Sequence, residues 1–376
     1  SGVMRFCYYE ITLFGDPEMP LFKKLQYDVG IIDLDYDKPI IDKSEILKIN
    51  LTVKNYGKVT NVNVSLYDNG KFYDSIVIPS LGELENRTIV LNWSSSENGT
   101  HELTLKLTPD QDDIDLTDNL KTITVGVLPV PILIVDDDAG MFYESYYKKS
   151  LDSLNLDYGV WNVHQYGSPD FNLLRNFSIV IWFTGDDCWS TLTPADQGNL
   201  SAYLDSGGRL FISGQDIGYD INGSSFYSNY LHALYIRDDT NIYTLEGVAG
   251  DPIGDNLLIG ISGGDGANNQ AYPSEIAPAD ANATCIFNYT GDGCGAIRVN
   301  TSTYQVVYFA FGFEAINTSQ DRDEIMYRIL KWFGFNFSIP PYLNNFSITP
   351  LIGNSSTLFN FTVIYRDVDN DTPRYI

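Results

Sequence analysis

Short segments of alternating apolar and polar residues recur between residues 27 and 127. The clearest of them cover residues 46–53, 62–67, 88–93 and 101–107. A period of two places one face of a strand in a core and the other in solvent, so each segment predicts a half-buried β-strand. Turn sequences such as Asn55-Tyr56-Gly57 and Asp68-Asn69-Gly70 separate the segments. Their spacing is typical of a β-sandwich over residues 27–127.

From residue 130 the apolar residues form continuous runs instead. These runs cover residues 132–135, 160–163, 178–183, 209–213 and 306–311. Between the runs, helical spacing links Tyr143, Tyr147, Leu151 and Leu154. Capping residues predict further helices from Pro194 to Gly207 and over 319–333. The alternation of strand and helix predicts a doubly wound, flavodoxin-like α/β domain over residues 130–335, with a β insertion at about 219–305.

The two ends of the chain carry shorter strand patterns. Residues 1–22 contain an alternating run that breaks at Gly15-Asp16-Pro17 and has no partner strand nearby in sequence. Residues 339–376 start at a Pro-Pro pair and predict the first half of a second immunoglobulin-like module. Both ends fall inside domains and no signal peptide precedes Ser1, so we expect a processed piece of a longer protein.

Composition and charge narrow the class of partner. Hydrophobic residues make up 44% of the 376 residues and aromatic residues 14%, which is enough for packed cores. Lys and Arg number 23 against 49 Asp and Glu, a net charge of −26. Such a surface repels phosphate backbones, so nucleic acid is excluded as a partner. No run approaches the ~18 apolar residues of a spanning helix, so we expect no membrane insertion in this segment.

Asn-x-Ser/Thr triplets are far more frequent than chance. Random placement of the 30 Asn and the 52 Ser and Thr would give about four. The chain has 17, at Asn50, Asn63, Asn86, Asn92, Asn98, Asn176, Asn199, Asn222, Asn282, Asn288, Asn300, Asn317, Asn336, Asn345, Asn354, Asn360 and Asn370. A polar surface composition is the plainer explanation. We favour dense N-glycosylation of an extracellular or cell-surface protein, with N-linked glycans at solvent-facing positions.

Four cysteines are too few for a disulfide scaffold. Cys285 and Cys294 flank a predicted hairpin turn at residues 290–293. In a tight register Cys294 would face Tyr289 rather than Cys285. We therefore expect buried free thiols at these positions rather than a bridge.

The sandwich segment resembles the CARDB domain, an immunoglobulin-like module of prokaryotic surface proteins. The residues that carry the resemblance are Val53-Lys54-Asn55-Tyr56-Gly57 and the run 110–119 before the last strand. The resemblance implies a role in adhesion or spacing without catalysis. Together with the abundant sequons, it points to an archaeal cell surface.

The alternating run near the N-terminus, Tyr8-Tyr9-Glu10-Ile11-Thr12-Leu13-Phe14-Gly15-Asp16-Pro17, is similar to the closing strand of gingipain-like cysteine peptidases. The similarity covers about a dozen residues. It implies that this chain is the accessory C-terminal region of a secreted peptidase, whose catalytic His and Cys would lie upstream.

Acidic residues follow four of the expected parallel strands. They are Asp136-Asp137-Asp138, Asp186-Asp187, Asp216 and Glu314. Ligands of open parallel sheets bind beyond the carboxyl ends of the strands, so Asp136, Asp137, Asp187, Asp216 and Glu314 are candidates for binding a cation or a sugar, or for acid–base work. The plainer alternative is that a chain with 49 acids carries acids on most of its loops.

The turn Gly214-Gln215-Asp216-Ile217-Gly218 has the spacing of a nucleophile elbow. Residues 130–335 resemble the class I glutamine amidotransferase-like fold, including its ThuA-like relatives. Active amidotransferases carry Cys at the elbow centre, where this chain has Asp216, and a His after a late strand, where it has Glu314. The Cys–His mechanism therefore does not carry over, and we expect no catalytic residues in this chain.

Two acidic runs have the spacing of calcium loops. Asp367, Asp369 and Asp371 stand at i, i+2 and i+4 but lack the Gly and the distal Glu of a complete loop. A weaker case is formed by Asp110, Asp112, Asp113 and Asp115. We expect no cofactor apart from structural calcium, and a solvated acidic turn is the alternative. The three histidines show no zinc spacing.

These observations favour a non-catalytic surface glycoprotein region that serves adhesion, spacing or assembly, with self-association or other surface proteins as partners. One alternative is the accessory region of a cysteine peptidase. A second is an acidic site that binds or hydrolyses glycans through Asp216 with Asp137 or Glu314.

Overall fold

The computed structural model describes residues 26–337, 342–354 and 356–366. The chain divides into two structural units, residues 1–130 and 131–376. The expected peptidase-like strand in residues 1–22 lies outside the described residues, as do Asp367, Asp369, Asp371 and the sequon at Asn370. Strand residues far outnumber helical ones, so the described chain is a β-rich, multi-sheet structure.

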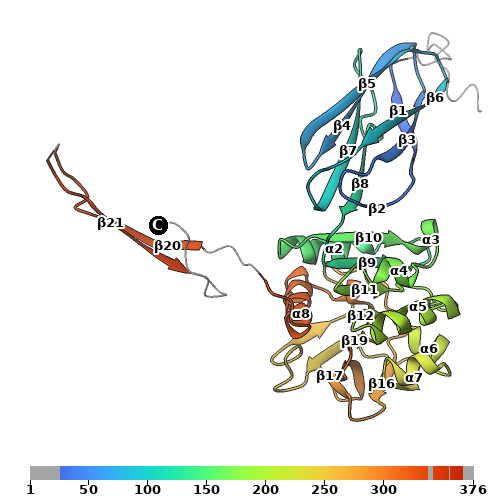
Figure 1. Cartoon of the computed structure of the whole chain (residues 1–376), viewed down its shortest axis with the longest axis vertical. Coiled ribbons are helices and arrows are strands. Elements are labelled where there is room, and N and C mark those ends of the chain that lie inside the picture. The colour runs from blue at the N-terminus through green and yellow to red at the C-terminus, as the bar shows by residue number, and fades with distance from the viewer. Residues whose placement is uncertain (1–25, 338–341, 355, 367–376) are drawn as a thin grey trace, which may run out of the picture. The chain divides into compact units, whose positions relative to one another are not determined.

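The first unit is a sandwich of two sheets (Figure 1). The smaller sheet has the order β1 (Val29–Tyr36), β3 (Leu47–Asn55), β6 (Asn86–Trp93). The larger sheet has the order β2 (Ile40–Ile41), β8 (Leu120–Val127), β7 (Gly99–Pro109), β4 (Thr60–Asp68), β5 (Lys71–Leu81). Alternate residues of β3 and β7 are buried, as the period of two predicts. Their apolar side chains form one core around Trp93.

Asn55 holds the turn after β3 from inside the unit. Its side chain is fully buried, and its amide nitrogen donates to the carbonyl oxygens of Lys58 and Leu81, both at 2.9 Å. Its side-chain oxygen accepts the N–H of Gly57. Three backbone groups therefore depend on one amide, which gives a physical reason for Asn in this sequence motif.

We expect Asn55→Ala to lower the stability of the first unit by about 2 kcal/mol, because it leaves buried carbonyls without donors. In hydrogen exchange of the full chain, peptides from β3 and β4 should exchange about 30-fold faster. Asn92→Ala, at an exposed position of β6, is the matched control. Unchanged exchange in the Asn55 variant would contradict the role given to this amide.

The second unit is built on one large sheet. Five neighbouring strands run parallel, in the order β10 (Tyr158–Asn162), β9 (Ile132–Asp136), β11 (Ile179–Phe183), β12 (Arg209–Ser213), β19 (Gln305–Phe309). The sheet continues with antiparallel strands in the order β18 (Cys294–Asn300), β17 (Ala283–Tyr289), β14 (Thr244–Gly247), β15 (Leu258–Gly260). Strand β16 (Glu275–Pro278) pairs with β18 and with β13 (Ala233–Arg237). These antiparallel strands thus extend the parallel part of the sheet.

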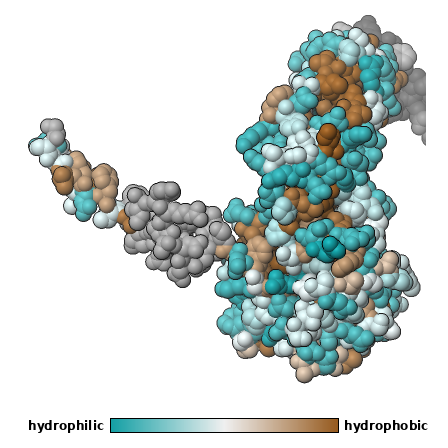
Figure 2. All heavy atoms as spheres, in the orientation of Figure 1, coloured by the Kyte–Doolittle hydropathy of each residue, from teal (hydrophilic) through white to brown (hydrophobic). Residues whose placement is uncertain are grey.

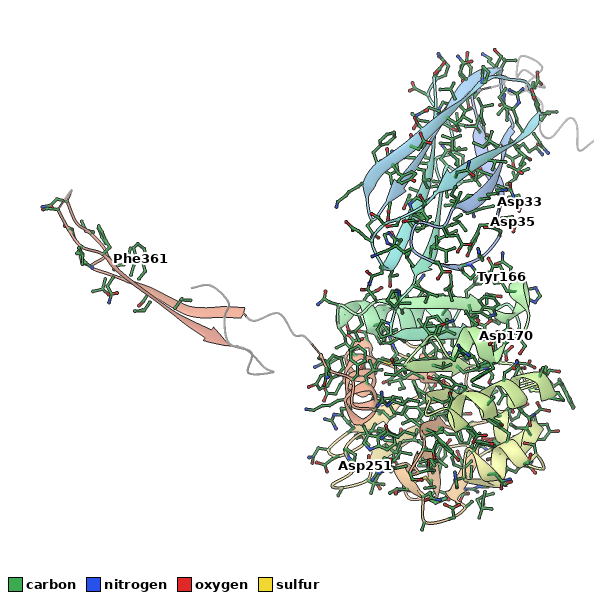
Figure 3. All side chains as sticks on the ribbon, in the orientation of Figure 1. Asp33, Asp35, Tyr166, Asp170, Asp251 and Phe361 are labelled. Carbon is green, nitrogen blue, oxygen red and sulfur yellow. A yellow bond between two sulfur atoms is a disulfide. The ribbon has the colours of Figure 1, made fainter. Side chains whose placement is uncertain are left out.

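Helices connect the parallel strands. They are α2 (Glu144–Ser153), α3 (Val163–Tyr166), α4 (Phe171–Leu174), α5 (Pro194–Asp205), α6 (Ile217–Ile221), α7 (Ser225–Asn229), the short η1 (Phe313–Ala315) and α8 (Ser319–Trp332). The predicted caps are present: Thr193 and Asp196 form a capping box at α5. Asp170 caps α4 by accepting the N–H of Leu173 at 2.8 Å (Figure 3).

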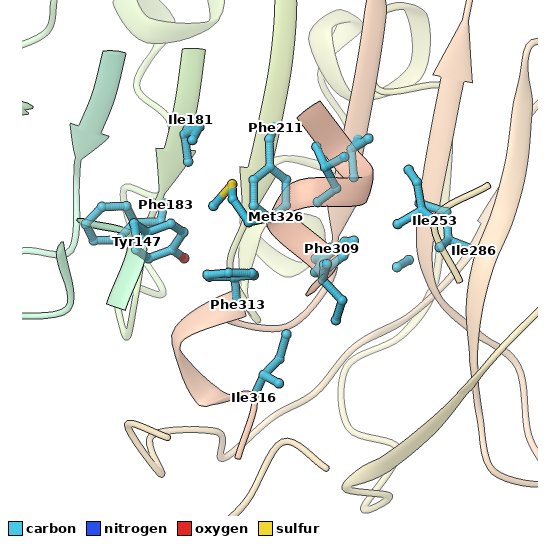
Figure 4. Packing of buried hydrophobic residues seen from close by; sticks show 14 of the residues in the cluster. Tyr147, Ile181, Phe183, Phe211, Ile253, Ile286, Phe309, Phe313, Ile316 and Met326 are labelled. Carbon is cyan, nitrogen blue, oxygen red and sulfur yellow. The ribbon is translucent and has the colours of Figure 1, made fainter. Parts of the chain in front are cut away.

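Aromatic rings fill the space between the sheet and its helices. Tyr147 of α2 stacks on Phe183 of β11 with ring centroids 4.3 Å apart and also contacts Phe313 (Figure 4). Phe211 of β12 packs edge-on against Phe313 of η1, so two strands and two helices meet in one cluster. The helical spacing of Tyr143, Tyr147 and Leu151 reflects this contact, because Tyr147 and Leu151 are fully buried.

Cys285 and Cys294 form a disulfide, so the prediction of free thiols is wrong. The prediction assumed a regular hairpin. Strand β17 instead contains two register shifts, between Cys285 and Phe287 and between Phe287 and Asn288, and Cys294 lies opposite Asn288. These irregularities leave the two Cα atoms 6.1 Å apart, within the range of a bridge. Cys188 is a free thiol in the described part of the chain.

Alkylation of the folded, unreduced chain should therefore label Cys188 and leave Cys285 and Cys294 unlabelled. Peptide mapping by mass spectrometry with chymotrypsin, which cleaves after Phe287 and Tyr289, should recover Cys285 and Cys294 in two crosslinked peptides that separate on reduction. Labelling of Cys285 before reduction would contradict the bridge.

The predicted start of a second module contains two paired strands. β20 (Tyr342–Thr349) and β21 (Asn360–Arg366) are antiparallel with a register shift. Phe361 projects from β21 and is 73% exposed (Figure 3). Two strands alone do not close a core, and the half module stays a prediction.

Candidate functional site

The carboxyl ends of four parallel strands lie side by side. Asp136 at the end of β9 is opposite Phe183 of β11, which is opposite Ser213 of β12, and Ser213 is opposite Phe309 of β19. The loops that follow these strands therefore start from one edge of the sheet. The candidates Asp136, Asp137, Asp187, Asp216 and Glu314 all lie in one of these loops or at the strand end itself.

Asp136, Asp138 and Glu144 form one compact group. Each offers a carboxylate oxygen within 4.8 Å of the others. Asp136 and Asp138 are 3% and 1% exposed, and Glu144 is half-buried in the first turn of α2. The pKa of Asp136 is raised to about 8, with burial as the largest cause and the charge of Asp138 as the second.

Asp137 has a different environment from Asp136 and Asp138. Its carboxylate accepts the indole N–H of Trp182 at 3.1 Å, and the charge with the largest effect on its pKa is that of Asp196 at the start of α5. Burial raises the pKa of Asp137 to about 8, with the charge of Asp196 as the second cause. Successive side chains at the end of a strand point to opposite faces of the sheet, and this separates Asp137 from Asp136 and Asp138.

Tyr143 links two of the strand-end loops. Its backbone N–H donates to Asp138 at 3.1 Å, and its hydroxyl donates to Asp186 at 2.6 Å. Gly185 has φ +51°, and a Cβ there would be 2.7 Å from the Cβ of Asp138, so glycine permits this close approach. The loop after β11 is therefore held against the loop after β9.

Asp216 follows β12 among other acids. It is 4% exposed, and burial, the largest cause, raises its pKa to about 7. The further causes are the charges of Asp238, Asp186, Asp187 and Asp220. The free thiol of Cys188 is in the same environment: burial raises its pKa, and Asp216 and Asp187 raise it further.

Glu314 is fully buried and accepts two hydrogen bonds. The hydroxyl of Tyr147 donates to it at 2.7 Å and the amide of Asn269 at 2.9 Å. The Tyr147 hydroxyl is also 2.7 Å from that of Ser213. Burial raises the pKa of Glu314, although both hydrogen bonds oppose the shift. This network connects the ends of β12 and β19 with α2 and the β insertion.

The segment from Gly214 to Gly218 joins β12 to α6, which is the strand–turn–helix arrangement of an elbow. Asp216 has φ −107° and ψ 3°, however, and does not show the strained backbone expected of an elbow nucleophile. Gln215 turns toward the insertion, where its side-chain oxygen accepts the N–H groups of Ala271 and Tyr272. The turn supports packing of the insertion against the strand end.

The structure thus divides the predicted site residues among several environments. Asp136 joins Asp138 and Glu144, Asp187 lies near Asp216, and Asp137 and Glu314 are each held by other partners. Sequence reasoning missed Glu144 and the part played by Tyr147. Glu144 follows Tyr143 at the start of a predicted helix, and that position was the available signal. No ion pair among the described residues involves any of these acids.

The histidines are held by local partners or lie at the surface. His101 contacts Asp68 and the Glu97 carbonyl, and His232 lies between Asp280 and Tyr304 at 2.6 and 2.9 Å. His164 is exposed and near Gly140 of the loop after β9.

Among the described residues, the group of Asp136, Asp138 and Glu144 has metal-ligand spacing, and the acids of the 110–115 run are not brought together in that way.

The sequon asparagines are at the surface. The side chains of fifteen of the seventeen are described; eleven are exposed, and Asn63, Asn199, Asn288 and Asn317 are half-buried. None of the fifteen is buried. On the face shown in Figure 2, hydrophilic residues surround several hydrophobic patches.

Comparison with known proteins identifies part of the chain. A sequence model of the CARDB family matches residues 31–121, so the first unit contains a CARDB domain. The CARDB domain of a Pyrococcus furiosus protein, solved in complex with di-metal ions, is 19% identical and covers 28% of this chain and 96% of its own, with a TM-score of 0.25. A domain of a candidate cell surface protein from Methanosarcina acetivorans is 21% identical and covers 27% and 93%, with a TM-score of 0.23.

A third solved structure covers more of the chain. It is a candidate GMP synthase component from Thermoplasma acidophilum, which is 13% identical and covers 55% of this chain and 94% of its own, with a TM-score of 0.39. The comparison with curated proteins gave no match. Among the described residues, no helix has the length and apolar character needed to span a membrane.

The raised pKa of Asp216 makes the stability of the second unit depend on pH. The folded state keeps the proton to about pH 7 and the unfolded state loses it near pH 4, so stability falls as the pH rises between these values. Asp216→Asn removes this loss. At pH 8 we expect the variant to be more stable by about 2–4 kcal/mol, since one pKa unit corresponds to about 1.4 kcal/mol.

Differential scanning calorimetry from pH 4 to pH 8 measures this difference. The gain in melting temperature should be largest at pH 8 and should vanish near pH 4. Asp323→Asn on α8 is the control for the loss of one negative charge. A gain that is equal at both ends of the pH range would contradict the assignment to Asp216.

Proposed function

We propose that this chain is a non-catalytic, N-glycosylated region of an extracellular or cell-surface protein, and that it serves adhesion, spacing or assembly. The observation that carries the proposal is the surface position of the sequons: none of the fifteen described asparagines is buried. The CARDB domain supports it, since such a domain occurs in a candidate cell surface protein of Methanosarcina acetivorans.

Three sequons share the outward face of the smaller sheet. Asn50 of β3 is opposite Val90 of β6, and Asn86 and Asn92 lie on either side of Val90 on the same exposed face. Residues of this face alternate with core residues such as Leu91, so their side chains point into solvent. Glycans on the three asparagines would cover the whole face and keep it from binding other proteins.

For residues 130–335, we propose a doubly wound, amidotransferase-like domain that has lost its enzymatic residues. The parallel order of β10, β9, β11, β12 and β19 supports this fold. Asp216 and Glu314 stand where the resemblance requires Cys and His, and Asp216 has an unstrained backbone. Glycan hydrolysis by Asp216 with Glu314 is disfavoured by the geometry, because Glu314 is fully buried against Tyr147, and hydrolysis by Asp216 with Asp137 stays the alternative.

The gingipain-like run at Tyr8 to Pro17 favours a second function for the parent protein. In that case the chain is the accessory region of a secreted cysteine peptidase whose catalytic domain lies upstream. Adhesion or spacing by this region and peptidase activity of an upstream domain are compatible. Peptides that precede Ser1 in the native protein and contain a His-Gly pair and a Cys would support this alternative.

Glycopeptide mapping of the protein from its native source tests the main proposal. We expect glycans on most of the eleven exposed sequons, including Asn50, Asn86 and Asn92, and lower occupancy at the half-buried Asn288. Asn288 pairs within the sheet opposite Cys294, which hinders modification of the folded chain. Unmodified asparagine at all of these positions would overturn the proposal.

A further inference from the structure

We propose that Asp136, Asp138 and Glu144 bind one divalent cation that prefers oxygen ligands, with Ca²⁺ as the ion that fits the group best. The three residues offer three carboxylates and no nitrogen or sulfur ligand, which selects hard cations. Their oxygens lie within 4.8 Å of one another. Ca²⁺–O bonds of about 2.3–2.6 Å allow ligands on opposite sides of one ion to be about 4.6–5.2 Å apart.

The orphaned oxygens of the group point to a ligand independently of its charge. Asp136 is only 3% exposed, and its Oδ1 has no hydrogen-bond donor. The Oε2 of Glu144 is also buried without a donor. A buried carboxylate oxygen without a partner is costly, and such atoms usually indicate a donor or an ion.

Three of the other four oxygens of the group, those of Asp136 and Asp138, are held in place by the surrounding chain. Asn162 of β10 donates to Oδ2 of Asp136 at 2.8 Å, which leaves Oδ1 for the ion. The backbone N–H groups of Gly140 and Tyr143 donate to the two oxygens of Asp138, each at 3.1 Å. Each of these oxygens keeps a second lone pair. The ligands therefore need little rearrangement to bind an ion.

The described residues supply little opposing charge. Lys148 is one turn further along α2, and its charge acts on Glu144 and is not among the influences on Asp136. None of the three acids takes part in an ion pair among the described residues. A proton shared by Asp136 and Asp138 is the competing explanation, and a direct test of metal binding distinguishes the two.

The test is a Ca²⁺ titration of the full chain after dialysis against a chelator, followed by calorimetry and by hydrogen exchange. We expect saturable binding and slower exchange in peptides that cover residues 132–146. Asp138→Asn should weaken binding at this site at least tenfold and abolish the protection. Mg²⁺ should bind more weakly, because it gives up its waters reluctantly and is usually held by only one or two carboxylates.

Two other acidic runs are rival calcium sites, so they provide the matched controls. Asp369→Asn and Asp113→Asn should leave the protection of residues 132–146 unchanged. If Asp138→Asn does not fold, as judged by circular dichroism, Glu144→Gln on the half-buried first turn of α2 takes its place. Absence of Ca²⁺-dependent protection in the wild type, or its persistence in the folded variant, would overturn the proposal. The proton shared by Asp136 and Asp138 would then be the explanation of the group.

Discussion

The parallel register of β9, β11, β12 and β19 is the constraint on which the second unit depends. Because these strands end side by side, the residues that follow them are forced into one region, and many of those residues are acidic. Like charges in a poorly solvated region repel one another and lose hydration. The interactions that compensate this repulsion determine the local structure. Backbone N–H groups just before α2 donate to Asp138, tyrosine hydroxyls donate to Asp186 and Glu314, and Asp216 holds its proton to about pH 7.

Tyrosine has an unusual part in this compensation. Tyr143, the N-cap residue of α2, and Tyr147 are one helical turn apart. Each donates its hydroxyl to a carboxylate from a different strand-end loop. A phenol satisfies one acceptor without adding positive charge, and its ring packs in the core, as Tyr147 does against Phe183. The unit thus lowers the cost of its buried acids by hydrogen bonds and protons more than by ion pairs, in a chain that has few cations.

Hydrophobic patterning predicted the strands and helices because it reports burial directly. The period of two in β3 and the apolar run of β11 correspond to one buried face and to complete burial. Strand ends were also predictable, so Asp136 and Asp216 could be named as candidates. Glu144 could not be grouped with Asp136 from sequence, since that contact depends on how α2 returns to the sheet. The bridge from Cys285 to Cys294 was not predicted for a related reason: the register shifts of β17 cannot be recognised in the pattern of apolar residues.

That bridge has a consequence for a chain exposed to proteases. The turn at Thr290, Gly291 and Asp292 is exposed, which makes it a natural point of cleavage. A cut there would leave β17 and β18 covalently joined through Cys285 and Cys294, next to the parallel part of the sheet. The nicked chain would therefore retain both strands in place until it met a reducing agent, and cleavage and loss of structure would be two separate events.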